Sequence, residues 1–196
     1  MLRRFVSLTA AAVVLASPLT AQTLTEDQAK KELFSSKTTE IGVSSALSAS
    51  DQATLRALLP VMKERLATPV GYFGALAFSP TEGVVSESLQ GALNYHTLAA
   101  AEAAALAACE AAKASGSARC KIGARILPKG YAPKDFTLSQ QATEDFEKGY
   151  SRARGPRAFA ASSTTGAWGW DTSGAAAVQA CAADGVADCR VVIEDQ

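Results

Sequence analysis

The chain has 196 residues, with 19 basic and 19 acidic side chains and therefore no net charge. This balance gives no electrostatic reason to expect nucleic acid or an anionic membrane surface as a partner. The length suits one compact domain, or two small ones that share a core.

The first 21 residues read as a secretory signal peptide. Arg3 and Arg4 precede an apolar run over residues 5–16, and the small residue Ala21 marks the expected cleavage site, with Ala16 as the alternative. The run is shorter than the roughly 20 residues that a membrane-spanning helix needs, so no stable membrane anchor is expected after cleavage. The sequence thus predicts a periplasmic or extracellular protein.

Residues 22–70 are expected to form an N-terminal helical segment. "TEDQ" at residues 25–28 fits a capping box, which predicts a helix over about 26–34. A second helix is expected to begin near Asp51, where apolar residues recur at helical spacing. This apolar stripe consists of Leu55, Leu58, Leu59, Met62 and Leu66. Pro60 lies inside the stripe, and we expect it to kink or split the helix.

From residue 71 onward, one pattern occurs twice. "ALAFSPTEG" (75–83) and "AFAASSTTG" (158–166) share alanine, hydroxyl and glycine positions at an offset of 83 residues, and both predict a strand followed by a turn. A second strand is expected to follow each turn. Each copy continues into an alanine-rich helix, "AAALAACEA" (103–111) and "AAAVQACAA" (175–183), and then into a short strand.

The repeated pattern predicts an internal duplication of a strand–strand–helix–strand unit. Repeat 1 spans residues 71–127 and repeat 2 spans 157–196, with residues 128–156 as a linker that contains a helix. The predicted fold is therefore α+β: two disulfide-stapled repeats sharing a core, preceded by N-terminal helices.

The four cysteines, Cys109, Cys120, Cys181 and Cys189, all lie in the exported part. An even number in an oxidising compartment predicts disulfides, and four cysteines allow three pairings. In each repeat the first cysteine lies late in the helix and the second opens the next strand, so we expect Cys109–Cys120 and Cys181–Cys189, with the crossed pairings as alternatives. The spacing matches neither a zinc site nor a Cys-x-x-Cys redox pair, so no metal or cofactor is expected.

His96, in "NYHT", is the only histidine of the chain. Any Ser-His-Asp site would have to use it, with the neighbouring Tyr95 as a second candidate. No Gly-x-Ser-x-Gly nucleophile motif accompanies them. Thr97 is the expected N-cap of the first alanine-rich helix. A position beside this cap or in an exposed loop is the simpler expectation for His96.

Trp168 and Trp170 are two residues apart on a predicted strand and therefore share one face. Exposed, they would form a surface on which a sugar or peptide could stack. Packed inside, they would supply the bulk that an alanine-rich core lacks. The positions expected to correspond in repeat 1, Val85 and Glu87, are not aromatic.

The strings "FGALAFSPTEG" and "RAFAASSTTGAWGW", each followed by an alanine-rich helix ending in cysteine and by "CKI" or "CRV", resemble a secreted bacterial domain-of-unknown-function family with paired-cysteine repeats. The resemblance covers residues 72–127 and 157–196. It implies a small exported α+β module and carries over no catalytic residue. No motif for a cofactor lysine is present, so a pyridoxal-phosphate enzyme such as aminolevulinate synthase is not supported.

The sequence thus predicts a small exported binding or interaction protein that contacts an envelope component or another protein. The alternative is a small extracytoplasmic enzyme that uses His96.

Overall fold

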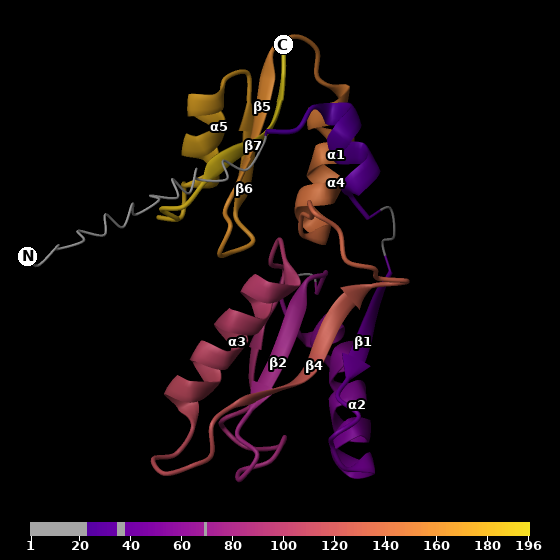
Figure 1. Ribbon diagram of the computed structural model, residues 1–196, viewed down its shortest axis with the longest axis vertical. Coiled ribbons are helices and arrows are strands. Elements are labelled where there is room, and N and C mark those ends of the chain that lie inside the picture. Colours follow the sequence, from indigo (N-terminus) through magenta and orange to yellow (C-terminus); the bar gives the residue numbers. More distant parts are fainter. Residues whose placement is uncertain (1–22, 35–37, 69) are drawn as a thin grey trace, which may run out of the picture.

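The computed structural model describes residues 23–34, 38–68 and 70–196 (Figure 1). The predicted signal peptide and its cleavage site lie outside these residues. The helices are α1 (Glu26–Glu32), α2 (Ala49–Arg65), α3 (Leu98–Ala112), α4 (Gln140–Lys148) and α5 (Gly174–Cys181). The strands are β1 (Thr39–Val43), β2 (Gly74–Phe78), β3 (Gln90–Ala92), β4 (Lys121–Pro128), β5 (Arg157–Ala161), β6 (Trp168–Asp171) and β7 (Arg190–Asp195). The predicted α+β class is confirmed.

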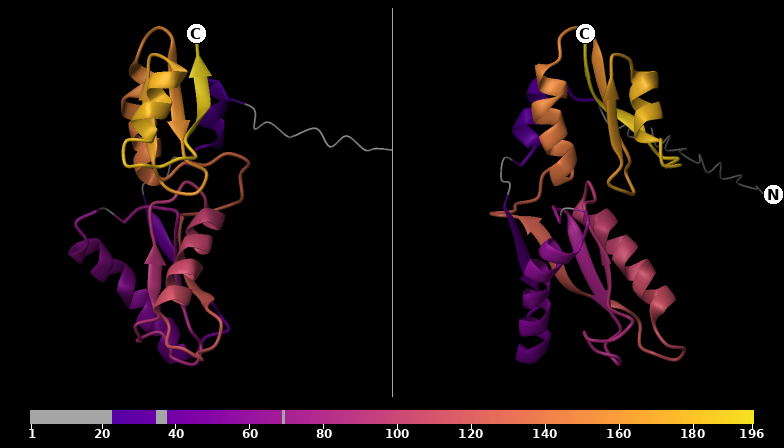
Figure 2. Two further views of the ribbon diagram at one scale, coloured as in Figure 1. Left: turned by 90° about the vertical axis from the view of Figure 1, so that its left-hand side faces the viewer. Right: turned by 180° about the vertical axis from the view of Figure 1, so that it is seen from behind.

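These elements form two lobes stacked end to end (Figures 1 and 2). The first lobe holds a four-stranded antiparallel sheet in the order β1-β4-β2-β3, together with α2 and α3. The second lobe holds a three-stranded antiparallel sheet in the order β6-β5-β7, together with α1, α4 and α5. Figure 2 shows α3 and α5 on one side of the molecule, with α2, α1 and α4 on the other. Each sheet is therefore covered by helices on both faces.

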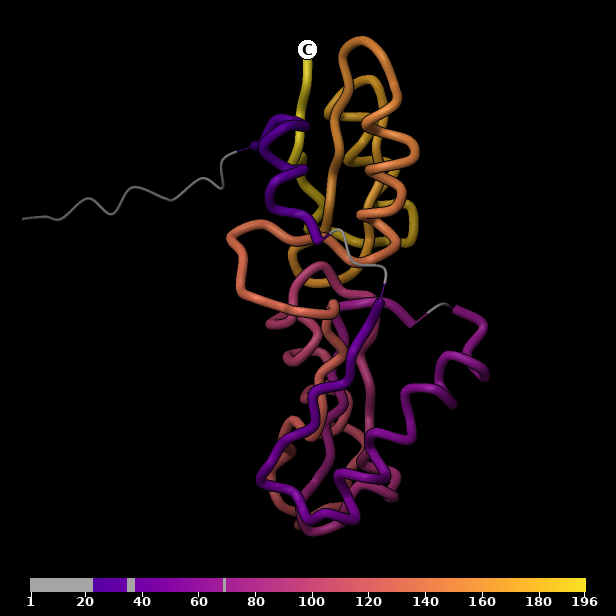
Figure 3. Tube along the Cα trace, turned by 90° about the vertical axis from the view of Figure 1, so that its right-hand side faces the viewer, coloured from indigo at the N-terminus to yellow at the C-terminus, as the bar shows by residue number. Residues whose placement is uncertain are grey.

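The chain crosses between the lobes twice, as the tube in Figure 3 shows. It starts in the second lobe with α1, builds the first lobe from β1 to β4, and returns to α4 through residues 129–139, the return connection. Residues 22–70, predicted as one helical segment, are thus divided between the lobes. They also contain the unpredicted strand β1, which pairs with β4 from Thr39↔Pro128 to Val43↔Ala124. That strand is stabilised by a distant partner, which local sequence does not reveal.

In the first lobe, β2 is buried on both faces, and its side chains alternate in size from one face to the other. Ala75 and Ala77 pack with the alanines and Cys109 of α3. Leu76 and Phe78 point the other way and pack with Leu55 of α2. Small residues on one face let α3 approach the sheet closely, while large residues on the other face supply most of the buried apolar area.

The second lobe is built in the same way. Ala158 and Ala160 of β5 pack with α5, whereas Phe159 packs with Phe146 of α4 and with Tyr150 in the 3-10 turn that follows α4. Helix α4 is therefore part of a core, although residues 128–156 were predicted as a linker. The expected core common to both repeats is not found, because no hydrophobic cluster of the described residues joins side chains from both sheets. Helices on both faces of each sheet close each lobe by itself.

The two predicted repeats have the same element order and strand pairing, β2-β3-α3-β4 and β5-β6-α5-β7. The β-bulges fall at Leu76/Ala77 and at Phe159/Ala160, which are 83 residues apart (159 − 76), the offset of the sequence pattern. This equivalence supports the duplication, which stays a prediction from the sequence.

The repeats differ in their second strand. In the first lobe, the residues after Gly83 form turns, Val85 is 85% exposed, and the strand comes only at Gln90–Ala92. The prediction of a strand directly after Gly83, with Val85 and Glu87 in place of the tryptophans, is therefore wrong. By register, Phe159 faces Trp170 and its counterpart Leu76 faces Gly91, so a glycine occupies the position of Trp170.

Most predicted helix starts are confirmed, and of the two expected effects of Pro60, splitting of the helix does not occur. Thr25 and Gln28 form the capping box of α1, and Thr97 caps α3 through the Ala100 amide. Helix α2 runs through Pro60 without being split. The proline is exposed, and so is Arg56, whose carbonyl loses its helical donor there. Water can therefore replace the missing hydrogen bond.

Both expected disulfides are present, Cys109–Cys120 with Cα atoms 6.2 Å apart and Cys181–Cys189 with Cα atoms 6.0 Å apart. Each joins the alanine-rich helix of its lobe to the beginning of the next strand. The cysteines thus act as the predicted staples, and the crossed pairings are excluded.

Candidate functional site

A cleft with a volume of about 740 Å³ lies between the two lobes. The first lobe contributes Phe73, His96 and the first turn of α3, at residues 97–99. The second lobe contributes residues 161–163 and 190–192, and the return connection closes the cleft with residues 131–138. The cleft therefore exists only because the lobes are docked.

The walls of the cleft are mostly apolar, with a few charged groups. The apolar side chains are Leu24, Phe73, Leu98, Phe136, Leu138, Val191 and Val192, and the charged ones are Glu32, Lys134, Asp135 and Arg190. The Lys134 ammonium already donates to the carbonyls of Lys31 and Leu33, at 3.3 Å each, and lies 4.8 Å from the centre of the Phe34 ring. Arg190 is exposed at the beginning of β7.

His96 lines the cleft at the point where the two lobes touch, and it is only 3% exposed. The Ser139 amide donates to Nδ1 at 3.0 Å, and Nε2 lies 2.8 Å from the Ala167 carbonyl oxygen. A backbone amide can only donate and a carbonyl can only accept, so the ring is the neutral tautomer that carries its proton on Nε2. His96 thus bridges to α4 and to the loop before β6 at once.

The backbone of His96 adds two further bonds across the junction. Its amide donates to the Thr165 carbonyl at 3.3 Å, and its carbonyl accepts from the Thr137 hydroxyl at 2.6 Å. His96 is thus the expected neighbour of a helix cap, because it precedes the N-cap Thr97 of α3, but the alternative of an exposed loop residue is wrong. The catalytic alternative finds no support either, because both ring nitrogens are engaged by backbone groups.

Burial lowers the pKa of His96 to about 4, against the Ala167 carbonyl and the charge of Asp188, which raise it. The ring is therefore neutral at neutral pH, in agreement with its hydrogen bonds. Tyr95 is partly buried against the alanine cluster of the first lobe and does not line the cleft.

Asp188 holds the loop that contacts His96. Its carboxylate accepts from the Ser162 hydroxyl at 2.6 Å and from the hydroxyls and amides of Ser163 and Thr164 at 2.7–3.0 Å. These donors, Ser162 first, keep the pKa of Asp188 well below its ordinary value. Because Asp188 precedes Cys189, the second disulfide fixes the position of this carboxylate. In the sequence, only the place of Asp188 beside a cysteine marks it, because its hydroxyl partners lie 24 to 26 residues away.

Trp168 and Trp170 share one face of β6, as predicted, and are partly buried against the core of the second lobe. Both indole Nε1 groups donate to Oδ2 of Asp145 on α4, at 3.1 Å each. Gly149 makes room for this contact, since a Cβ there would lie 2.8 Å from Trp170. The tryptophans thus attach α4 to the sheet, and their donors are already used within the protein. Trp168 also lies edge-on to His96, with ring centres 6.4 Å apart.

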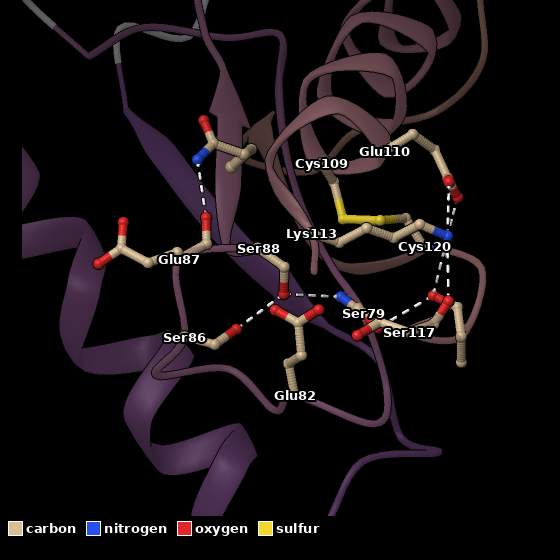
Figure 4. Close-up of a disulfide and its surroundings, with 12 residues drawn as sticks. Ser79, Glu82, Ser86, Glu87, Ser88, Cys109, Glu110, Lys113, Ser117 and Cys120 are labelled. Atoms are coloured by element: carbon tan, nitrogen blue, oxygen red, sulfur yellow. Dashed lines mark hydrogen bonds and ion pairs between the residues drawn. A yellow bond between two sulfur atoms is a disulfide. The ribbon is translucent and has the colours of Figure 1, made fainter. Parts of the chain in front are cut away.

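A group of serines lies beside the first disulfide (Figure 4). The Ser79 amide donates to the Ser88 hydroxyl at 3.1 Å, and the Ser79 hydroxyl donates to the Ala118 carbonyl at 2.9 Å. On the other side of the disulfide, Glu110 accepts from the Cys120 amide at 2.7 Å. These bonds tie the turn after β2 to the disulfide loop. None of them involves a histidine, so the group reads as structural.

In residues 23–34, 38–68 and 70–196, no group of three or more histidine, cysteine, aspartate or glutamate side chains could hold a metal ion. No helix there is long and apolar enough to cross a membrane. The two disulfides are compatible with an exported protein. Comparisons with protein-family models, with curated proteins and with solved structures find no match to this chain.

Proposed function

We propose that the protein is an exported binding module whose cleft between the lobes takes a small, largely apolar organic ligand. The observation that supports this most is the cleft itself. Its volume of about 740 Å³ falls within the 300–1,000 Å³ typical of small-molecule sites, and its apolar walls with a few polar groups match such sites as well.

The cleft has the properties of a preformed site. His96 and the loop held by Asp188 fix one side through short hydrogen bonds, so little ordering is needed when a ligand enters. Leu98, Phe136 and Val191 are partly exposed and offer apolar contact area, and Arg190 offers a charged group. The predicted signal peptide and the disulfides would expose this site to envelope components, which is where we expect the ligand to come from.

The test uses anilinonaphthalene sulfonate, a fluorescent and largely apolar anion, and the chain without its first 21 residues. Ala99 and Ala103 are exposed alanines one turn apart on α3, but only Ala99 lines the cleft. Ala99→Trp should fill the cleft and weaken binding of the dye by about tenfold or more. Ala103→Trp is the matched control and should leave the affinity unchanged.

Near-ultraviolet circular dichroism of both variants confirms that they are folded. Equal dye affinity in the two variants would contradict the proposal, because the dye would then bind elsewhere. The absence of any dye fluorescence with the unchanged chain would do so as well.

A further inference from the structure

The hydrogen bonds that join the lobes converge on His96. Its ring and backbone contact the N-cap of α4, the return connection and the loop before β6. All three belong to the second lobe or lead into it, whereas His96 itself directly precedes α3 of the first lobe. Other contacts accompany it. The Gln140 amide donates to the Tyr72 carbonyl at 3.0 Å, and Gly166 lies against the Asn94 carbonyl. The Tyr72 hydroxyl donates to the carbonyl of Phe34, which follows α1, at 3.2 Å, and the Phe34 ring packs against the rings of Tyr72 and Phe73.

This arrangement accepts only the neutral ring. Nδ1 must offer a lone pair to the Ser139 amide at 3.0 Å. A proton on Nδ1 would place two N–H groups against each other in a site that is closed to water. While the lobes stay docked, the bond from Nε2 to Ala167 persists, so the first bond lost is the one to α4. Separation of the lobes then also breaks the bonds of His96 to Ala167 and Thr165.

We propose that His96 is an acid-sensitive latch between the two lobes: a proton taken up at Nδ1 breaks the bond to Ser139 and lets the lobes separate around the cleft. The inference goes beyond the proposed binding function, since it depends on the junction alone. It holds for the empty protein as well as for one that carries a ligand.

The groups around the ring indicate that the change in charge on acidification takes place at His96 itself. The residues that touch it, Thr137, Ser139, Thr165, Ala167 and Trp168, are uncharged. Asp188 favours the protonated ring and stays ionised itself, because its hydroxyl and amide donors keep its pKa low. The other charged groups of the cleft are Glu32, Lys134, Asp135 and Arg190.

The size of the pH effect on lobe separation follows from the difference in the pKa of His96 between the docked and the separated form. In the docked form the pKa of His96 is about 4, against an ordinary value of 6.5 for an exposed ring. Protons therefore bind the separated form more tightly. The difference between these two pKa values limits the whole shift toward separation to about 300-fold, and lowering the pH from 6.5 to 4 supplies about 80-fold of it.

The single histidine allows a direct test by NMR, with the chain from residue 22 onward and no histidine tag. We expect the ring resonance to titrate near pH 4 and the amide signals of Ser139 and Ala167 to move with the same midpoint. The methyl groups of Ile126 and Ile193, buried in the first and second lobe respectively, should keep their folded shifts. Relaxation rates of the two lobes should then diverge, as expected for bodies that tumble independently.

Two variants assign the transition. His96→Gln has no titrating ring, so the acid response of the Ser139 amide should disappear. Asp188→Asn removes the charge that favours the protonated ring, and it should lower the midpoint of His96 even if the glutamine variant fails to fold.

Three results would overturn the latch. The first is a ring midpoint in the ordinary range near 6.5, and the second is a ring that titrates without any change at Ser139. The third is loss of the Ile126 and Ile193 methyl shifts at the same midpoint, which would mean that the whole chain unfolds. A dye that fails to bind at neutral pH would overturn the binding proposal and leave the latch unaffected.

Discussion

Replacing Gly166 by alanine is expected to force the two lobes apart. A Cβ at this position would lie 1.8 Å from the carbonyl oxygen of Asn94, whereas ordinary contact begins at 3.4 Å. Both atoms belong to backbone, so no flexible side chain can give way. The two segments must therefore move apart by about 1.6 Å (3.4 − 1.8).

This displacement would break neighbouring hydrogen bonds. The His96 ring lies 2.8 Å from the Ala167 carbonyl, one residue beyond Gly166, and an added 1.6 Å takes that distance well past hydrogen-bonding range. The bond from the His96 amide to Thr165, at 3.3 Å, would be lost with it. Two lost bonds and a buried donor without an acceptor cost about 2–4 kcal/mol.

The assay is urea unfolding at pH 7, followed by tryptophan emission because Trp168 lies beside the junction. Gly42→Ala is the control, since Gly42 is an exposed residue of β1 with no atom within 4 Å of an added Cβ. The control should change stability by less than about 0.5 kcal/mol. If Gly166→Ala were as stable as the control, the close contact between the lobes would not exist in solution, and the junction described above would be wrong.

Three further predictions concern the disulfides, the tryptophans and pH. Replacing both cysteines of a pair by alanine should lower the free energy of unfolding by about 3 kcal/mol for Cys109–Cys120 and about 2.5 kcal/mol for Cys181–Cys189, because the paired residues are 11 and 8 apart in the chain. Unfolding in urea measures this loss, and a value below about 1 kcal/mol for either pair would contradict the prediction. Asp145→Ala leaves two partly buried indole donors without their acceptor, so it should lower the free energy of unfolding by about 2 kcal/mol and shift the tryptophan emission. Asp145→Asn keeps an acceptor oxygen and should lower it by less. Equal losses in the two variants would argue against the shared bond. The folded protein lowers the pKa of His96 to about 4 from 6.5, so the unfolded chain takes up the proton first, and the free energy of unfolding should fall by about 3 kcal/mol between pH 6.5 and pH 4. The difference in urea midpoint between the unchanged chain and His96→Gln should therefore shrink over that window. A constant difference would refute the assignment.

Local patterns in the sequence predicted the disulfides and the helix caps correctly. Each disulfide joins residues only 11 or 8 apart, across one turn of the chain, so the helix and the following strand bring them together by themselves. The caps of α1 and α3 depend on residues within one turn. Alternation within β2 and β5 likewise identified strands, although not what covers each face.

The candidate site was not predictable in the same way. The sequence selected His96 as the sole histidine, but its role follows from contacts 43 and 71 residues away, with Ser139 and Ala167. Trp168 and Trp170 were expected to share a face, and they do; their common partner Asp145 carries no local signal. The cleft draws on six separate stretches of chain and has no motif of its own.

The sequence by itself determined the α+β class, the two disulfides and the N-caps of α1 and α3, because neighbouring residues decide backbone conformation and short loops. The tertiary structure decided that there are two lobes with separate cores and that α1 and α4 both belong to the second lobe. It also decided that His96 is buried where the two lobes meet. Those outcomes depend on pairings between distant segments, such as β1 with β4 or His96 with Ala167. Their energies come from burial and hydrogen bonding across the assembled fold, which no single segment encodes.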